Sequence, residues 1–551
     1  MKTLLILSIL VALSISLYSM PVAWTQFQKD IGIQAAQFKD SPEHQQIRNS
    51  RDSRTYVVGD THTFWRWNLA VMPPTWIQTP ATCRAVGEHC YIFVANDQWN
   101  IHMTQANVDS ALVRLEQNTP NNPDTGAIMM DVNLFGPIPD ELDNDPKLIV
   151  FYSALGSFQG TSFDGYFSAY NQVTEAQAQM MNPPGHSNEC EMIYMTCYPL
   201  NPVQPIRLSV LAHELEHLIH WGQDANEESW IDEGCAELAM VAYGVPDPIS
   251  GFPSNPDNNL TVWNQQFADY VKVMLFFTYL KEHYDSTGMI RDLVADPMNG
   301  MNSLNSQVSI HYPQLSTDEI LHNWSIANAL DSPQPGDGLY NYEELDLPNF
   351  TMTNITLPYT SYSGTVQPFA SDYIRYSPTQ NTGLTLVSGS GLYLSQIAFD
   401  SSGTCTEFFP AWWGYEFAIP PISFNSVYSI FVITNTNATT ATYNYVTTFV
   451  ANEDNTQSAP AVSTLNCYPN PFSSTVNINY SLKNTGHTTL NIYNTKGQLV
   501  RKLIDESKSA NQYEATWSGD SDADKSLPSG IYFIRLQNGS ETKVQKVLLL
   551  K

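Results

Sequence analysis

The middle of the chain carries apolar residues at helical spacing. Between Pro205 and Gly222, leucines fall on one stripe at intervals of three or four residues, which predicts a helix with one apolar face. Proline suits the first turn of a helix and glycine suits the position just after its end, so we expect this helix to fill the range between the two. The same pattern predicts further helices over residues 107–118, 229–244, 267–284 and 317–330.

Segments with strand character precede these helices. They are rich in β-branched and aromatic residues, and they alternate or form short apolar runs, as strands of a buried or half-buried sheet do. They comprise residues 63–71, 89–97, 147–155 and 190–197. Together these patterns predict a mixed α/β lobe that leads into a helical part.

The composition changes after the Pro/Gly-rich stretch at residues 331–338. Residues 350–450 are rich in Thr, Ser, Asn, Tyr and Val, with strand patterns between turn signals, which predicts a β-sandwich. Residues 451–462 have the composition of a linker, and residues 463–551 form a last all-β unit. We therefore expect a multidomain chain, in line with its length of 551 residues.

The first residues have the pattern of an export signal. Lys2 is followed by a largely apolar run from Leu4 to Leu17 and by the small Ser19, which is typical of a signal peptide over residues 1–19. Residues 20–54 are polar with weak periodicity, so we expect either a pro-segment or a loosely held N-terminal arm. No later apolar run is long enough to cross a bilayer, so no stable membrane span is expected.

The charge is strongly acidic and unevenly distributed. The formal net charge is −29, and residues 463–551 hold ten Lys and Arg against seven Asp and Glu, a net of +3, so the rest carries −32. Such a surface repels nucleic acid and anionic lipid, which excludes both as expected partners. Export permits disulfides, and by spacing Cys83 with Cys90 and Cys190 with Cys197 are candidates to close small loops.

The stretch "HELEH", residues 213–217, carries the pattern of a metal site. His213 and His217 are four positions apart on the predicted helix, so their imidazoles project from one face and can hold one cation. Glu214 lies beside them. Two histidines, one carboxylate and an open position form the ligand arrangement of hydrolytic zinc sites, whereas structural zinc sites use four protein ligands.

The next predicted helix supplies matching carboxylates. Glu233 lies sixteen residues after His217, which allows it to be the third zinc ligand. Glu237 lies one helical turn beyond, where it can accept the spare N–H of a zinc-bound histidine. A metal site explains an acidic pair on this otherwise apolar helix better than a solvated face does.

The motifs "HELEH" and "WIDEGCAE" resemble those of the gluzincin clan of zinc metallopeptidases. Residues 140–345 are most similar to the hyicolysin-like neutral metallopeptidases of secreted bacterial proteins. The resemblance implies an α+β, zincin-like metallopeptidase domain over residues 55–345. Such a domain has a twisted sheet whose edge strand lies over the cleft, an active-site helix and a helical lower lobe.

The ligand set implies hydrolysis by an activated water molecule. One catalytic Zn²⁺ held by His213, His217 and Glu233 lowers the pKa of a bound water, and Glu214 takes its proton during attack on a peptide carbonyl. Residues 269–282 resemble a helix of aminopeptidase-N-like gluzincins whose leading tyrosine stabilises the oxyanion. That tyrosine matches Tyr270, although Val273 replaces the glycine expected after the lysine, so Tyr270 is either this stabiliser or a packing residue.

Three polar neighbours are not expected to bind the metal. His220 lacks the glycine turn and the more distant histidine of a metzincin site, so we expect a partly exposed histidine, or one behind the ligands, near the helix end. Glu216 is expected to point elsewhere on the helix. Asp232 is expected to be a surface or capping residue.

The last residues carry three ordered motifs: "CYPNPFSSTVNINYSL", "LNIYNTKGQLVRKL" and "LPSGIYFIRLQNGSETKVQKVLLLK". They resemble the type A C-terminal sorting domain of the type IX secretion system, which implies an Ig-like all-β fold, export through the type IX machinery and a secreted or cell-surface location. An ordinary immunoglobulin-like adhesion module is the alternative. The stretch Asp520–Asp524 lacks the glutamate of a calcium loop, so we expect a hairpin turn there, and a structural Ca²⁺ has no support in the sequence.

These patterns predict a secreted zinc endopeptidase that acts on proteins or peptides. The alternatives are a catalytically inactive zinc fold used for surface binding or adhesion, and an aminopeptidase. Glu214 favours the active enzyme, because metal binding alone does not need it. The absence of a G-x-M-E-N motif favours the endopeptidase over the aminopeptidase.

Overall fold

A computed structural model describes the chain in two compact units. The first comprises the residues up to Thr317 together with Tyr342–Phe350, and the second comprises Asp318–Asn341 and Thr351–Lys551. The predicted signal peptide and the predicted linker at residues 451–462 lie outside the described residues. The described residues are 22–39, 41–71, 74–158, 161–356, 362–377, 382–419, 426–449, 464–523 and 525–551.

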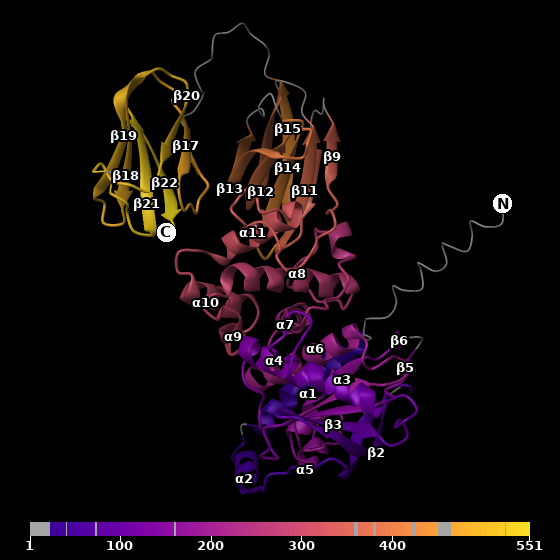
Figure 1. Ribbon diagram of the computed structural model, residues 1–551. Helices are drawn as coiled ribbons and strands as arrows, with labels where there is room; N and C mark the ends of the chain where they lie inside the picture. Colours follow the sequence, from indigo (N-terminus) through magenta and orange to yellow (C-terminus); the bar gives the residue numbers. More distant parts are fainter. Residues whose placement is uncertain are drawn as a thin grey trace, which may run out of the picture. The chain divides into compact units, whose positions relative to one another are not determined.

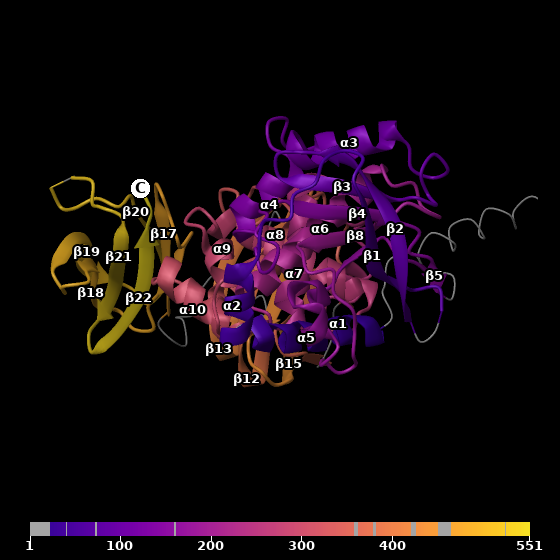
Figure 2. The ribbon, with the colours of Figure 1, turned by 90° about the horizontal axis from the view of Figure 1, so that it is seen from below.

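The first unit contains a mixed six-stranded sheet in the order β1-β2-β3-β4-β8-β7, five strands of which are labelled in Figure 2. The pairs β3–β4 and β4–β8 are parallel, while the pairs β1–β2, β2–β3 and β7–β8 are antiparallel. The short β7 is therefore an antiparallel edge strand. The strands are β1 (Thr61–Asn68), β2 (Thr75–Val86), β3 (Cys90–Ala95), β4 (Leu148–Ser153), β7 (Gly165–Phe167) and β8 (Met192–Thr196).

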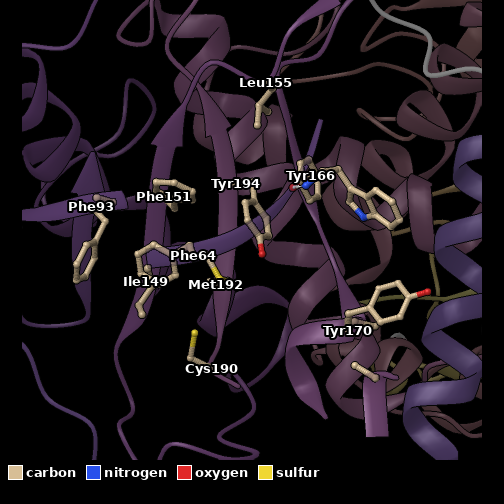
Figure 3. Packing of buried hydrophobic residues seen from close by; sticks show 14 of the residues in the cluster. Phe64, Phe93, Ile149, Phe151, Leu155, Tyr166, Tyr170, Cys190, Met192 and Tyr194 are labelled. Carbon is tan, nitrogen blue, oxygen red and sulfur yellow. Dashed lines mark hydrogen bonds between the residues drawn. The ribbon is translucent and has the colours of Figure 1, made fainter. Parts of the chain in front are cut away.

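Aromatic side chains fill the core along this sheet (Figure 3). Phe64 lies with its ring centroid 5.1 Å from that of Phe93 and 4.9 Å from that of Phe151, on three different strands. Tyr166 of β7 stacks on Tyr194 of β8 at 4.3 Å. Fully buried aromatic rings dominate core energetics, so these contacts fix the edge strand to the rest of the sheet.

The helices α6 (Pro205–Gln223), α7 (Ser229–Tyr243) and α8 (Phe267–Tyr284) form the other side of the unit, and α6 and α7 lie next to each other in Figures 1 and 2. A Cβ atom on Gly234 would lie 2.3 Å from the ring of Phe277, so the glycine permits α7 and α8 to approach closely. Further helices of this unit are α3 (Gln105–Glu116), α4 (Ala127–Phe135), α9 (Met289–Val294) and α10 (Met301–His311).

The predicted helices and strands of the first unit are present, with ends shifted by up to three residues, as in α3 and β1. α6 does not stop before Gly222 but continues to Gln223, and the backbone N–H of Asp224 then donates to the carbonyl of His220 at 2.7 Å. By contrast, Gly244 ends α7 with a φ of 99°, a left-handed conformation that glycine adopts without strain.

The N-terminal arm is helical rather than loose. It forms α1 (Val22–Lys39) and α2 (Pro42–Ser50), and Ile31 and Ala35 of α1 are fully buried in the core of the first unit. The indole Nε1 of Trp221 donates a hydrogen bond to the carbonyl of Gly32 at 3.0 Å. The arm is therefore packed onto α6.

Residues 318–341 group with the second unit, whereas Tyr342–Phe350 group with the first. In α11 (Thr317–Leu330), the buried His322 lies 2.7 Å from Thr434 Oγ1 through Nδ1 and 2.7 Å from Ser395 Oγ through Nε2. Both hydroxyls belong to strands of the second unit, so α11 covers that sheet.

Apart from this helix, the described residues of the second unit form β-strands and their connections, and the middle part is β-sandwich-like. β12 pairs with β15 through residues 382–388 and with β14 through residues 393–399, while β13 pairs with its other edge. The strands of this part are β9 (Thr353–Thr356), β10 (Tyr362–Val366), β11 (Ala370–Ser377), β12 (Thr382–Phe399), β13 (Cys405–Ile419), β14 (Tyr428–Asn435) and β15 (Ala441–Phe449).

The C-terminal part has two sheets, β16-β17-β20 and β19-β18-β21-β22, that share one core. Asp520 and Ser526 form an antiparallel bridge, which confirms the predicted turn, although Asp524 lies outside the described residues. The strands are β16 (Thr464–Tyr468), β17 (Val476–Ser481), β18 (Gly486–Asn494), β19 (Leu499–Lys508), β20 (Gln512–Trp517), β21 (Gly530–Asn538) and β22 (Glu541–Leu549).

The two disulfides considered from spacing do not form, and the cysteines are free thiols. Cys190 and Cys197 lie at opposite ends of β8, so the extended chain holds them about 20 Å apart. Cys83 pairs in register with Phe93, three residues along β3 from Cys90. Bridging either pair would require the strands to come apart.

Candidate metal centre

The helix α6 positions the two predicted histidine ligands. Pro205 occupies its first turn, and Leu211, Leu215 and other apolar residues are buried, which fixes the rotation of the helix about its axis. His213 and His217 consequently face the same side, with their Nε2 atoms 3.2 Å apart.

Glu233 reaches the same point from α7. Its Oε2 lies 3.6 Å from His213 Nε2 and 3.9 Å from His217 Nε2. A tetrahedral zinc ion with bonds of 2.0–2.2 Å separates its ligand atoms by about 3.4 Å. The three atoms therefore have the spacing of three ligands to one ion of this size.

The outer nitrogens of both histidines face carboxylates. His217 Nδ1 lies 3.0 Å from Asp232 Oδ1, and His213 Nδ1 lies 3.4 Å from Glu237 Oε1. Glu237 lies near His213 but makes no hydrogen bond with its Nδ1. Asp232 is a half-buried residue in the first turn of α7, and its contact with the ring of His217 is one that the sequence did not predict.

The donor set itself points to a cation. When Nδ1 of a neutral histidine carries the proton that it donates to a carboxylate, its Nε2 presents a lone pair. Burial lowers the pKa of His217, but Asp232 and Glu233 outweigh this and hold it well above its ordinary value, so its protonated ring can donate from Nε2 to His213 Nε2 across 3.2 Å. A divalent cation could take the place of this proton, because it would attract both nitrogens and the buried carboxylate oxygen of Glu233.

The pKa shifts of the buried carboxylates and of His213 are compatible with cation binding at this place. Burial raises the pKa of Glu233 to about 8 and that of Glu237 to about 8. Burial, and then the charge of His217, lower the pKa of His213 to about 4, so His213 is neutral and able to ligate at neutral pH. A divalent cation would stabilise the ionised form of Glu233.

Glu214 lies beside the three ligand atoms without being one of them. Its Oε2 accepts a hydrogen bond from the backbone N–H of Phe167 on β7 at 2.9 Å. The edge strand thus holds this carboxylate in place. Both residues line a cavity of about 140 Å³ that also contains His213, His217 and Glu233.

Tyr270 lines the same cavity from α8. Its side chain is largely buried, and its ring contacts that of Trp263 edge-on at 4.7 Å between centroids. Burial, and then the nearby carboxylates of Glu233 and Glu237, hold its pKa well above the ordinary value. The phenol keeps its proton and can donate a hydrogen bond into the cavity.

His220 and Glu216 form a separate pair behind the ligands. His220 Nδ1 lies 2.9 Å from Glu216 Oε1, and both side chains are fully buried. The expectation of a partly exposed His220 is therefore wrong, while Glu216 does point away from the ligand face. Burial lowers the pKa of His220, but Glu216 outweighs this and raises it to about 9, which favours a charged pair at neutral pH.

The N-terminal arm also reaches this cavity, a contact that was not predicted from the sequence. Gln28, Lys29 and Gly32 of α1 line it together with the predicted ligands. Gln28 Nε2 donates to the carbonyl of Phe167 at 2.6 Å, and Lys29 is close enough to act electrostatically on Asp232. Gln28 and Lys29 lie more than 130 positions before the residues with which they interact, so spacing and periodicity cannot reveal these contacts.

Known proteins resemble only parts of this chain. No curated protein matches it. Among solved structures it is similar to PorZ, a surface component of the type-IX secretion system of Porphyromonas gingivalis, with 18% identity and a TM-score of 0.13 over 19% of this chain and 14% of that one. Dimeric latent PorU from the same organism has 14% identity and a TM-score of 0.18 over 31% of this chain and 18% of that one. The adhesin domain of Epf from Streptococcus pyogenes has 11% identity and a TM-score of 0.13 over 34% of this chain and 77% of that one.

The chain therefore spans only a small part of PorZ and of PorU, and TM-scores this low carry no argument about the fold. The family of secretion system C-terminal sorting domains matches residues 466–550. Among the described residues, no helix is long and apolar enough to cross a membrane. The C-terminal part of the chain is thus a type IX sorting domain, which indicates secretion or a place at the cell surface.

Proposed function

We propose that the chain is a secreted zinc endopeptidase whose first unit is a zincin-like domain of the gluzincin type. The observation that carries this is the convergence of His213 Nε2, His217 Nε2 and Glu233 Oε2 within 3.9 Å, beside the non-ligating carboxylate of Glu214. A purely structural zinc site would have a fourth protein ligand in place of this arrangement.

The architecture around the site supports the proposal. An antiparallel edge strand lies against the helix that bears both histidines, and the third ligand comes from the next helix. A free strand edge presents backbone groups that can pair with an extended peptide. A peptide bond lying along β7 would run past Glu214, whose carboxylate is held by the backbone of Phe167.

Each residue then has a defined task. Zinc held by the three ligands would supply electrostatic activation of water and of the peptide carbonyl. Glu214 accepts the proton of the attacking water and passes it to the leaving amine. Tyr270 donates a hydrogen bond to the carbonyl oxygen as negative charge develops on it. Asp232 and Glu237 keep both histidine rings oriented.

We also propose that residues 22–54 are a pro-segment that covers the cleft. Gln28 donates a hydrogen bond to the carbonyl of Phe167, an edge-strand group with which an extended substrate would form a hydrogen bond. Gly32 and Lys29 line the same cavity, and burial of Ile31 holds the helix there. In this state, the substrate and the arm compete for one surface.

The first expected result concerns the metal and the reaction class. The chain should contain one zinc ion, and after release of its arm it should cleave denatured protein and N-acetylated peptides. Treatment with 1,10-phenanthroline should lower the cleavage rate at least about 100-fold, and added ZnCl₂ should restore it. Metal content is measured by mass spectrometry, and cleavage by chromatography of a peptide library.

Other outcomes separate the alternatives. A chain that binds one zinc and cleaves no peptide after release of the arm would be a surface-binding protein with an inactive zinc fold. A chain that cleaves peptides with free N-termini but spares their N-acetylated forms would be an aminopeptidase.

The second expected result tests the role of Asp232. Asp232→Asn replaces the carboxylate that lies 3.0 Å from His217 Nδ1 with a weaker acceptor. Zinc affinity should fall about 10- to 100-fold, as is usual when the partner of a ligating histidine is lost. Competition with a chelator of known affinity measures it. Asp124→Asn, an exposed loop substitution, is the matched control and should leave the affinity unchanged.

A further inference from the structure

Three carboxylates gather away from the zinc ligands, at the ends of two parallel strands. Asp140 and Asp143 lie in the loop before β4, and Glu191 directly precedes β8. β4 and β8 are adjacent and parallel, with Ile149 opposite Met192, so both chain segments enter the sheet at the same edge. One oxygen from each carboxylate lies within 4.8 Å of the others.

Two of these carboxylates are buried, Asp140 is half-buried, and the cluster is incompletely paired. Asp143 and Glu191 are only 3% and 2% exposed. Glu191 Oε1 accepts the backbone N–H of Glu141 at 2.9 Å, but its Oε2 has no hydrogen-bond partner, and neither does Asp140 Oδ1. A buried carboxylate oxygen without a partner is costly, and two of them belong to one cluster here.

Positive side chains near the cluster are directed elsewhere. Among the described residues, no Lys, Arg or His nitrogen lies within 4.0 Å of the three carboxylates. Lys39 pairs with Glu141 at 3.2 Å, and Arg51 pairs with Glu189 at 2.7 Å. Arg54 donates from Nη1 to the carbonyl of Asn188 at 2.8 Å and acts on Asp143 only at longer range. Three carboxyl groups therefore share this place without an ion pair among the described residues, while Arg48 and Arg54 act on Asp140 and Asp143 only at longer range.

The chemistry of the ligands selects the class of cation. All three offer oxygen, and none offers nitrogen or sulfur, which favours Ca²⁺ or Mg²⁺ over zinc. Ca²⁺ bonds of 2.3–2.6 Å allow two ligand oxygens to lie up to about 5 Å apart, which includes the whole spacing of this cluster. An irregular loop that supplies two of the three carboxylates also suits the variable coordination of Ca²⁺ better than the octahedron of Mg²⁺.

We propose that Asp140, Asp143 and Glu191 bind one Ca²⁺ ion that fixes the loop at residues 136–147 to the sheet. The same loop also holds the N-terminal arm, because Asn144 Nδ2 donates to the carbonyls of Arg48 at 3.1 Å and Arg51 at 2.7 Å. The ion would therefore order the surface on which the arm is anchored. This site does not depend on the proposed peptidase activity.

The test uses the full chain, freed of metal and then saturated with one equivalent of ZnCl₂. Isothermal titration with CaCl₂ should show one site, and Ca²⁺ at about 100 times its Kd should raise the first unit's Tm by about 3–6 °C. MgCl₂ at the same concentration should raise it by less than half as much. Tb³⁺ offers a second readout, because Tyr91, whose hydroxyl donates to Asp145 in the same loop at 2.7 Å, can sensitise its luminescence.

Two variants locate the site. Glu191→Gln and Asp143→Asn should each weaken Ca²⁺ binding at least about 10-fold and abolish most of the Tm shift. Glu189→Gln is the matched control, because Glu189 lies two residues away and pairs with Arg51. This variant should keep wild-type Ca²⁺ affinity and the full Tm shift. A wild-type chain with no calorimetric binding and no Ca²⁺-dependent Tm shift would overturn the proposal, as would a full response in Glu191→Gln. The three carboxyl groups would then be stabilised by protons shared between them, and not by a cation.

Discussion

Replacing Glu214 with glutamine is expected to lower kcat/KM for peptide cleavage about 10²- to 10⁴-fold, the usual contribution of general acid–base catalysis. The amide cannot accept the proton of the attacking water. Its oxygen can still accept the N–H of Phe167, which now donates to Glu214 Oε2 at 2.9 Å, so the edge strand should keep its place. Because Glu214 is not among the three converging ligand atoms, the zinc content should stay at one per chain.

Zinc content and activity must be measured on the same arm-released preparation. Glu88→Gln, in an exposed turn remote from the ligands in sequence, is the matched control and should have wild-type activity. A Glu214→Gln variant that cleaves at the wild-type rate would remove Glu214 from the mechanism. Loss of zinc in this variant would instead mean that Glu214 acts as a ligand.

Release of the N-terminal arm is expected to raise kcat/KM at least about 10-fold. A tethered segment competes with substrate at an effective concentration near the millimolar range, so its removal should expose the cleft. A specific protease site is inserted between Asp52 and Ser53, which are both exposed, and the chain is cut after it has folded. Separation of the fragment is checked by size-exclusion chromatography and mass spectrometry.

Two controls make this result specific to the arm. The wild-type chain, exposed to the same protease, should keep its low activity. A synthetic peptide of residues 22–52, added back to the released enzyme, should inhibit it, and the same peptide with Gln28→Ala should inhibit less, because it cannot donate to the carbonyl of Phe167. Equal activity before and after release would show that the arm is not inhibitory, and would leave the peptidase proposal intact.

The helices that bear the site were predictable because their signals are local. His213 and His217 lie four positions apart on an amphipathic helix, and that spacing alone places them on one face. Glu233 followed from its position on the next apolar helix. In each case the residue pattern and the helix period are sufficient to place the side chain.

Long-range contacts were not predictable. The position of Asp232 against His217 depends on how α6 and α7 cross, and Phe167 reaches Glu214 only because the sheet places β7 at its edge. The periodicity of residues 317–330 predicts a helix with a buried face, but not which core will cover it, and α11 packs on the second unit through His322. The cysteine spacings were misleading because strand register, rather than distance along the chain, decides which thiols can meet.

The close approach of α7 and α8 at Gly234 determines how far apart two of the proposed site residues lie. Glu233 is the residue just before this glycine on α7, and Tyr270 lies two helical turns before Phe277 on α8. The distance between the proposed metal ligand Glu233 and the proposed oxyanion donor Tyr270 therefore depends on the helix–helix contact at Gly234, and not on the conformation of a loop. If the proposed peptidase activity holds, variation in the loops can alter which peptides enter the cleft while the spacing of the reacting groups stays constant.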